Sequence, residues 1–210
     1  MSEAKETVFL VDDDASVLKG LRRLLTAAGF EVAAFESPQQ FLDHHDASAA
    51  GCLVLDVAMP GLNGMELQQE LAARGSTLPI VFLTGHGDVP TSVQAMKRGA
   101  ADFLTKPVDE NDLLAAIRSA FEKGRAIRKT RAETVEIEQR LATLTPRERE
   151  VLAHIVGGKR NKQVAGELGT VEKTIKVHRA RVMEKMQVRS LAELVRLAER
   201  AGIRGTPPEN

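Results

Sequence analysis

The sequence has no tryptophan, no tyrosine and a single cysteine in 210 residues. Proteins that hold single-stranded nucleic acids usually stack the bases on aromatic side chains, and the seven phenylalanines lie in apolar contexts that offer no such platform. A lone cysteine cannot form a disulfide within the chain, so we expect Cys52 to be a buried strand residue of a cytoplasmic protein. These absences argue against a single-stranded nucleic acid binder and against a disulfide-stabilised fold.

Long apolar runs are also missing. No run approaches the roughly 20 residues that a membrane span requires, and residues 1–6 lack the apolar region of a signal peptide. The hydrophobic content of 43% and the charged content of 28% are ordinary for a globular protein. We therefore expect a globular cytoplasmic protein that does not enter a membrane.

The net charge of zero conceals a difference between the two parts of the chain. Residues 1–120 contain 9 Lys and Arg against 17 Asp and Glu, whereas residues 121–210 contain 20 against 12. An acidic part joined to a basic part suggests two domains, the second of which faces a polyanion. Two solvated surfaces of opposite sign would explain the charges equally well.

The first 120 residues alternate short apolar runs with longer amphipathic stretches. The predicted strands are Thr7–Val11, Phe30–Phe35, Cys52–Leu55, Ile80–Thr84 and Ala101–Thr105. The predicted helices are 15–28, 37–46, 64–74, 89–98 and 109–121. Strand–helix alternation repeated five times predicts a doubly wound α/β domain with a five-stranded parallel sheet over residues 1–121.

The pattern becomes purely helical after residue 121. Residues 122–143 are charged and contain no strand-like run, so we expect a helical linker that prolongs the preceding helix, with Gly124 as a candidate bend. Four helices should follow, at 146–156, 161–168, 171–186 and 190–201. The helix at 146–156 has a clear start signal: Thr145 is its N-cap, Pro146 takes the first helical position and Glu148 completes a capping box. The tail, residues 205–210, should be disordered.

Acidic and basic side chains follow the ends of four predicted strands. Asp12 and Asp13 follow the first strand, Asp56 ends the third, Thr84 ends the fourth and Lys106 follows the fifth. Ligand sites of open α/β sheets lie at this edge. Three carboxylates there would repel one another unless a hard cation such as magnesium neutralised them. One carboxylate could then attack a phosphoryl donor while the metal and a lysine offset the charge.

Each of these features alone has an ordinary explanation. Aspartates after a strand are commonly helix caps, a role that suits Asp14. A threonine within a strand is unremarkable, and a Lys–Pro pair is usually a turn. The functional interpretation rests on all of them meeting at one edge.

Residues 7–121 resemble the receiver domain of two-component response regulators. The resemblance is carried by Val11–Asp14, Leu55–Gly61, Leu83–Gly87 and Gly99–Pro107. It implies that Asp56 is the phosphoacceptor and that Mg²⁺ is held directly by Asp13, Asp56 and the Ala58 carbonyl, and through water by Asp12. It further implies that Thr84 and Phe103 form the switch pair and that Lys106 contacts the phosphoryl group. The Lys106–Pro107 peptide bond is expected to be cis. Residues 85–90 resemble the FixJ-like subgroup in particular, with His86 in a loop role.

A helix–turn–helix pattern follows in the basic part. A short amphipathic helix at 161–168 is followed by Gly169 and by a second helix that opens at Val171. In such motifs the second helix enters the major groove, with base contacts from one face and phosphate contacts beside it. The expected DNA contacts are Lys159, Lys162, Lys173, Thr174, Lys176, Val177, Arg179 and Arg181. Charge alone would also fit a helical interaction domain with solvated cations.

Residues 144–204 resemble the LuxR-type DNA-binding domain, through Leu144–Leu152, Asn161–Ala165 and Val171–His178. Combined with a receiver, this is the NarL/FixJ arrangement. It implies a transcription regulator whose partners are a sensor histidine kinase, double-stranded promoter DNA and RNA polymerase, and which forms a homodimer when phosphorylated.

Three other functions fit the sequence less well. An aspartyl-nucleophile phosphatase or phosphotransferase of the haloacid dehalogenase type has a second aspartate two residues after the nucleophile, where this chain has Ala58. A quorum-sensing LuxR-type sensor has an aromatic-rich ligand domain, which a chain without Trp and Tyr does not provide. A receiver that switches without phosphorylation is disfavoured because every acidic and basic site position is filled. We therefore expect a regulator and not an enzyme.

Overall fold

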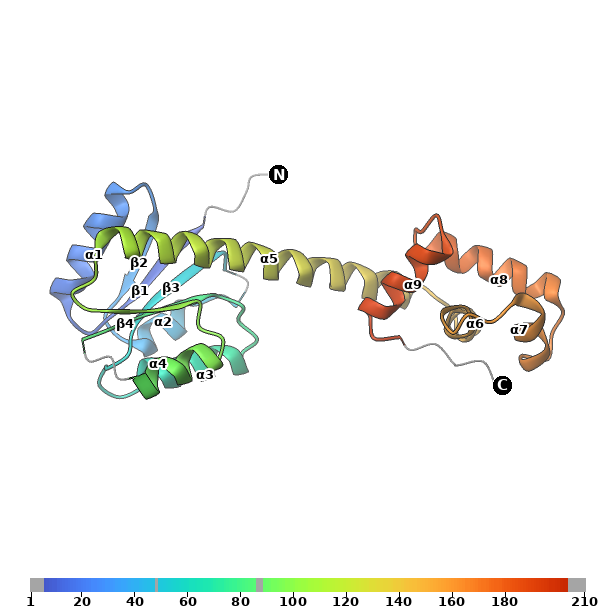
Figure 1. The fold of residues 1–210 in the computed structure, drawn as a ribbon, viewed down its shortest axis with the longest axis horizontal. Helices are drawn as coiled ribbons and strands as arrows, with labels where there is room; N and C mark the ends of the chain where they lie inside the picture. The colour runs from blue at the N-terminus through green and yellow to red at the C-terminus, as the bar shows by residue number, and fades with distance from the viewer. Residues whose placement is uncertain (1–5, 48, 86–88, 204–210) are drawn as a thin grey trace. The chain divides into compact units, whose positions relative to one another are not determined.

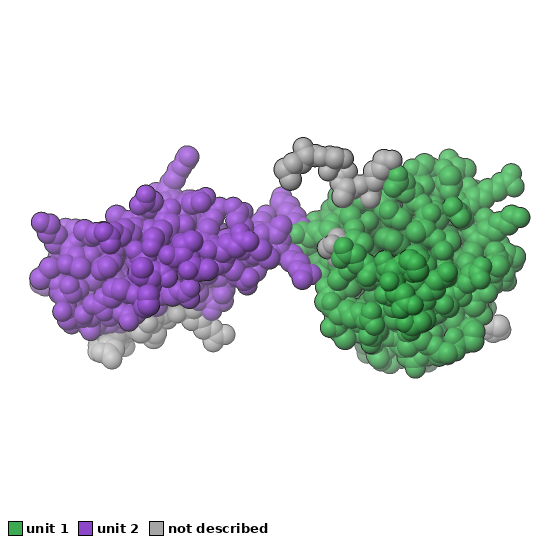
Figure 2. Space-filling model, turned by 180° about the vertical axis from the view of Figure 1, so that it is seen from behind, with its two compact units in different colours: residues 1–128 green, residues 129–210 purple. Residues whose placement is uncertain are grey.

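The computed structural model describes residues 6–47, 49–85 and 89–203 (Figure 1). His86 and the tail 205–210, for which the sequence made predictions, lie outside these ranges. The chain divides into two compact units, residues 1–128 and residues 129–210, which Figure 2 distinguishes by colour.

The first unit is built on five parallel strands, as predicted. They are β1 (Thr7–Val11), β2 (Glu31–Phe35), β3 (Gly51–Asp56), β4 (Ile80–Thr84) and β5 (Asp102–Thr105), in the spatial order β2-β1-β3-β4-β5. The pairing register sets Val11 beside Leu55, and Thr84 beside Thr105. The carboxyl ends of β1, β3, β4 and β5 therefore meet at one edge of the sheet.

Helices cover both faces of this sheet. They are α1 (Ala15–Ala27), α2 (Pro38–His44), α3 (Gly64–Ala73), α4 (Val89–Lys97) and α5 (Glu110–Ala142). Because strand side chains alternate between the two faces, Cys52 and Val54 pack with α1 and α5, whereas Leu53 and Leu55 pack with α2, α3 and α4. Cys52 is fully buried, as predicted, and burial raises the pKa of its thiol to about 12.

Helix α5 continues without a break through the predicted linker. Gly124 lies inside it, and a Cβ added there would lie 3.1 Å from Cγ of Pro79. The glycine is therefore explained by the close approach of the helix to Pro79, and the helix does not end or restart at this candidate bend.

The second unit contains α6 (Pro146–Val156), α7 (Asn161–Glu167), α8 (Glu172–Lys185) and α9 (Leu191–Arg200). The capping box of Thr145 and Glu148 that was predicted for the start of α6 is present. The buried core of this unit takes residues from all four helices: Val151, Leu152, Ile155, Val164, Ile175, Val182 and Leu194.

The last turns of α5 also belong to this second core. Ile137 is only 4% exposed, and the Arg140 guanidinium donates a hydrogen bond of 3.1 Å to the Met186 carbonyl at the end of α8. Further back along α5, Phe121 is buried in the first unit, and Arg125 and Arg128 both pair with Glu6. The contacts of each unit thus extend into residues 122–143, which the sequence assigned to a linker.

Candidate functional site

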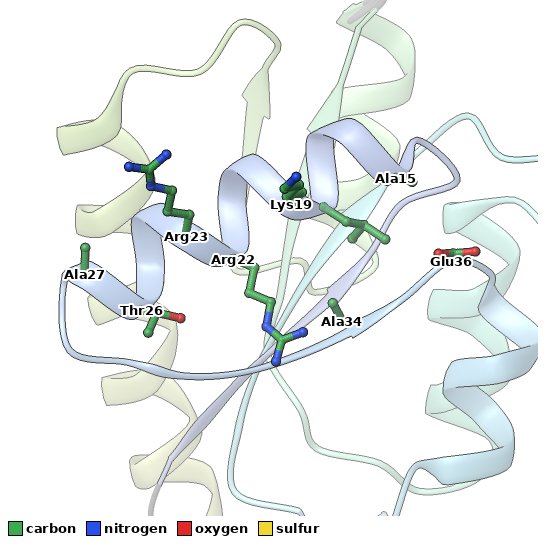
Figure 3. Close-up of a pocket in the computed structure, with 9 residues that line it drawn as sticks. Ala15, Lys19, Arg22, Arg23, Thr26, Ala27, Ala34 and Glu36 are labelled. Atoms are coloured by element: carbon green, nitrogen blue, oxygen red, sulfur yellow. The ribbon is translucent and has the colours of Figure 1, made fainter.

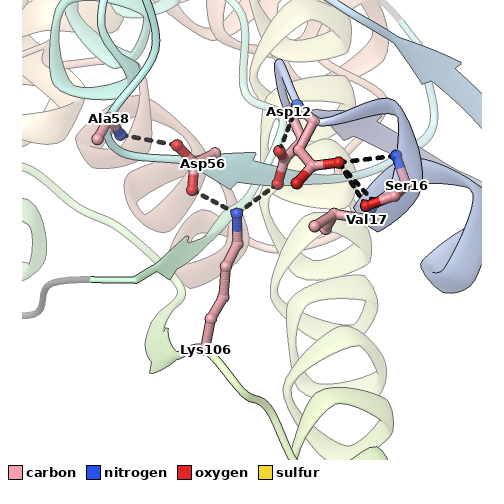
Figure 4. A network of polar contacts seen from close by, with 7 residues as sticks. Asp12, Ser16, Val17, Asp56, Ala58 and Lys106 are labelled. Carbon is pink, nitrogen blue, oxygen red and sulfur yellow. Dashed lines mark hydrogen bonds and ion pairs between the residues drawn. The ribbon is translucent and has the colours of Figure 1, made fainter.

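A lysine and two buried carboxylates meet at the carboxyl edge of the sheet (Figure 4). Asp12 follows β1, Asp56 ends β3 and Lys106 follows β5. The Lys106 Nζ lies 2.5 Å from Asp12 Oδ2 and 2.6 Å from Asp56 Oδ1. Asp12 is 3% exposed and Asp56 is 5% exposed, so the ammonium compensates two carboxylates that have little contact with water.

The electrostatics of this group follow from its burial. Burial raises the pKa of the Asp56 carboxyl, and the neighbouring Lys106 acts in the opposite direction. For Lys106 itself, burial is the largest influence and lowers its pKa, but the hydrogen bonds to Asp12 and Asp56 outweigh burial and leave the pKa raised. Lys106 is therefore charged at neutral pH and fixed at the nucleophile that the sequence predicted.

Backbone groups hold the remaining carboxylate oxygens. The amide of Ala58 donates to Asp56 Oδ2 at 2.8 Å, and the amide of Asp14 donates to Asp12 Oδ1 at 3.0 Å. Asp14 caps α1, as predicted, by accepting from the amides of Ser16 and Val17. Position 58 contributes only backbone groups, so the second aspartate of a haloacid dehalogenase-type site is not present there.

Asp13 does not join the other two carboxylates. It is exposed, and no cluster of three His, Cys, Asp or Glu side chains with metal-binding geometry occurs within the described ranges. The structure therefore brings Asp12 and Asp56 together at Lys106, and the role of Asp13 as a magnesium ligand stays a prediction. Lys106 neutralises part of the charge of this pair, while the Asp13 side chain is exposed.

The two predicted switch residues lie on adjacent strands. Thr84 is buried at the end of β4, and its carbonyl accepts a 2.7 Å hydrogen bond from the amide of Lys106. Phe103 is half-buried on β5, with its ring centre 6.0 Å from that of Phe82. The Lys106–Pro107 peptide is cis, as predicted.

These residues fit the magnesium ion that the receiver fold implies. Asp12 and Asp56 present carboxylate oxygens, the ligands that Mg²⁺ prefers, and a single ammonium lies between them. Two carboxylates against one ammonium leave an excess of negative charge, to which the exposed Asp13 adds. An additional cation at this edge is therefore electrostatically favourable.

The helix–turn–helix pair is formed by α7 and α8. Four of the residues predicted to contact DNA have exposed side chains on α7 and α8: Lys162, Lys173, Lys176 and Val177. Thr174, which was also predicted to contact DNA, is half-buried. Arg181 is exposed as well, whereas the half-buried Arg179 donates a 3.2 Å hydrogen bond to the Asn161 side chain. Arg179 therefore also links α8 to the start of α7.

Lys159 is not available for DNA, in contrast to the sequence prediction. The residue is 5% exposed, and its ammonium lies 2.6 Å from the Glu167 carboxylate at the end of α7. Separating the two groups would leave the buried Lys159 ammonium without a counter-ion, which is costly. Lys159 is therefore a structural residue of the α6–α7 connection.

Two residues that sequence reasoning missed, Arg140 and Lys185, connect the end of α5 to the end of α8. Arg140 bonds the Met186 carbonyl, and Lys185 bonds both the Thr143 carbonyl, at 3.1 Å, and the buried Glu148, at 2.6 Å. The capping box identifies Glu148 as a helix start, but the sequence gives no sign of its second partner, because Lys185 lies 37 residues away.

No helix in the described part of the chain has both the length and the apolar surface needed to cross a membrane.

Both units match known protein families. The response regulator receiver domain matches residues 8–118, and the bacterial regulatory proteins of the luxR family match residues 142–198. Fold and site together thus define a response regulator, in which a receiver is joined to a DNA-binding domain. The chain belongs to the NarL/FixJ family of response regulators, which regulate transcription.

Individual relatives match along nearly the whole chain. The transcriptional regulatory protein FixJ of Bradyrhizobium diazoefficiens is 47% identical over 95% of this chain and 97% of its own length. The response regulator protein TodT of Pseudomonas putida is 42% identical over 95% of this chain and 88% of its own length. A solved structure of the response regulator StyR is 51% identical, with a TM-score of 0.82 over 93% of this chain and 99% of that one.

Proposed function

We propose that phosphorylation of Asp56 controls the binding of this regulator to promoter DNA. The single observation that carries the proposal is the Lys106 ammonium bonded to both Asp12 and Asp56 at the carboxyl edge of the sheet. The phosphoryl donor would be a sensor histidine kinase, and the regulated process would be transcription by RNA polymerase in the cytoplasm. Family membership supports a kinase and a duplex DNA partner in general terms.

The chemistry follows from the side chains at this edge. An Asp56 carboxylate oxygen forms a bond to phosphorus while the bond from phosphorus to the kinase imidazole breaks. Lys106 offsets the negative charge that the phosphoryl oxygens bring to the site. Magnesium held by Asp12, Asp13, Asp56 and the Ala58 carbonyl would supply further positive charge at the same oxygens. Thr84 and Phe103 would then rearrange toward the phosphorylated residue.

Phosphorylation by a small donor tests the acceptor assignment. Acetyl phosphate with magnesium should add one phosphoryl group to the protein, measured by intact mass, and Asp56→Asn should remove this addition. Asp43→Asn is the control, because Asp43 is an exposed aspartate of α2 outside the site. Full labelling of the Asp56→Asn protein would contradict the assignment.

Salt-dependent DNA binding tests the roles proposed for α8. Lys176→Ala should weaken binding to a cognate duplex more than to a random one, by roughly 1–3 kcal/mol, because it removes a base contact. Arg181→Ala should weaken both equally and reduce the salt dependence, because it removes a phosphate contact. Equal losses on both duplexes for Lys176→Ala would show that Lys176 does not read bases.

A further inference from the structure

A hollow lies on the outer side of the receiver, between α1 and the strand β2 (Figure 3). Its volume is about 680 Å³, within the range of roughly 300–1,000 Å³ that is usual for binding sites. Small and apolar side chains line part of it: Ala15, Leu18, Ala27 and Ala34. The Asp12, Asp56 and Lys106 group does not contribute to it.

The charges around this hollow are mostly positive. Lys19, Arg22 and Arg23 line it from α1, against a single carboxylate, Glu36, from the end of β2. All three cations are exposed, and within the described ranges no ion pair engages them. They are three of only 9 basic residues in residues 1–120, which carry 17 acidic ones. A cluster of uncompensated cations in an acidic domain favours an acidic ligand.

The strand beside the hollow is an open edge of the sheet. Among the residues that the structure describes, β2 pairs with β1 alone. The Phe35 carbonyl accepts a hydrogen bond from the Asp12 amide, so the backbone groups of Phe35 point toward β1. Because these groups alternate along a strand, those of Val32 and Ala34 point away from β1. The next amide on that side belongs to Glu36, and it donates a 2.9 Å hydrogen bond to the Gln40 side-chain oxygen. Residues 31–35 contain no proline or lysine, the residues that commonly protect an edge.

We propose that β2 and the adjoining hollow dock an extended acidic segment of another protein, added to the sheet as a sixth strand. The backbone groups of Val32 and Ala34 would pair with the segment, and Lys19 and Arg22 would bind its carboxylates. An added strand would use both the open backbone groups of β2 and the cations of α1. A small anion would use the cations alone. The proposal is independent of Asp56 and of DNA binding.

A model peptide tests this docking on the full-length protein. The probe is a short blocked peptide of alternating threonine and glutamate, and its matched control carries lysine in place of glutamate. The glutamate peptide should slow amide hydrogen exchange at Val32 and Ala34 in NMR spectra. Exchange at Ala33 and Phe35 should stay unchanged, because these residues already face β1. Arg22→Glu should weaken binding about tenfold or more, which corresponds to about 1.4 kcal/mol. Lys97→Glu, an equal charge change at an exposed residue of α4, should not weaken binding.

A backbone variant separates strand addition from simple charge attraction. Ala34→Pro removes the outward amide, and proline is tolerated at edge positions whose amide faces solvent, so the variant should fold and lose the peptide. If this variant fails to fold, the comparison of Arg22→Glu with Lys97→Glu, together with the exchange data, tests the proposal. The proposal is overturned if millimolar glutamate peptide does not bind, if the lysine peptide binds equally well, or if binding perturbs Lys19 and Arg22 without protecting Val32 and Ala34.

Discussion

At the scale of single residues, Lys106 sets the charge balance of the receiver site. It is the cation that links Asp12 and Asp56, two carboxylates that are almost completely buried. Buried like charges without a counter-ion are strongly unfavourable, so this ammonium stabilises the receiver as well as serving the proposed phosphoryl transfer.

Replacing Lys106 should make the receiver depend on magnesium for its stability. Lys106→Met removes the ammonium and leaves two adjacent carboxylates, which we expect to lower the free energy of unfolding by about 2 kcal/mol without metal. Magnesium should stabilise this variant more than the wild type, because in the variant the metal ion does not compete with the Lys106 ammonium for the two carboxylates. Urea unfolding with and without MgCl₂ measures both effects. A variant as stable as wild type in metal-free buffer would contradict this account.

Glu148 should make the stability of the DNA-binding unit depend on acid pH. Hydrogen bonds from Lys185, and then from the Thr145 amide, lower the pKa of Glu148 from 4.5 to about 2. A carboxyl whose pKa is lowered by folding stabilises the protein above its unfolded pKa, and this stabilisation is lost as the pH falls toward the folded pKa. Glu148→Gln should therefore be less stable than wild type near neutral pH, by about 2 kcal/mol.

The difference between the two proteins should shrink as the pH is lowered from about 5 to about 2. Denaturant unfolding of wild type and Glu148→Gln across this range, followed by helical circular dichroism, measures it. A difference that stays constant with pH would mean that the charge of Glu148 is not responsible.

At the scale of helices and strands, two glycines inside helices have opposite surroundings. Gly20, in α1, has open space where a Cβ would be, whereas a Cβ added at Gly124, in α5, would lie 3.0–3.3 Å from side-chain atoms of Pro79 and Arg128. Gly20→Ala should stabilise the receiver by about 1 kcal/mol through helix propensity. Gly124→Ala should not give this gain, because the Pro79 ring must move. Thermal unfolding of the two variants compares them, and equal stabilisation would contradict the close packing of α5 on Pro79.

The elements themselves were largely predictable, because apolar periodicity determines them locally. The predicted bounds of the first and fourth strands are identical to those of β1 and β4, and the capping box located the start of α6. The side-chain contacts were less predictable. Lys159 pairs with a residue at the end of the next helix, and nothing near it in the sequence distinguishes it from an exposed lysine. Asp12 and Asp13 are adjacent in the sequence, but Asp12 is buried and shares Lys106 with Asp56, whereas Asp13 is exposed. Their neighbours in the sequence do not indicate which of the two is buried.

At the scale of the whole molecule, the proposed phosphorylation should change the state of assembly. Three large apolar side chains of α4 are exposed, Val89, Val93 and Met96, at 74%, 45% and 45%. We expect the face formed by α4 and β5 to pair as a two-fold dimer after phosphorylation, which would bring two copies of α8 onto one DNA site.

Equilibrium sedimentation with and without acetyl phosphate measures this assembly. The phosphorylated wild type should be a dimer, and Met96→Glu should remain a monomer while it still takes up one phosphoryl group, because the change places a charge on an apolar contact face. A phosphorylated wild type that remains monomeric at all concentrations would contradict the prediction.

The shared helix α5 has a consequence for how such regulators can be recombined. The receiver includes Phe121 and Gly124 of this helix, and the DNA-binding unit includes Ile137 and Arg140. A cut in the gene at the sequence-motif boundary near residue 144 would therefore remove part of the second core. A chimera that exchanges receivers should join the two genes inside codons 129–136. The same interval is where natural domain shuffling would yield folded hybrid regulators.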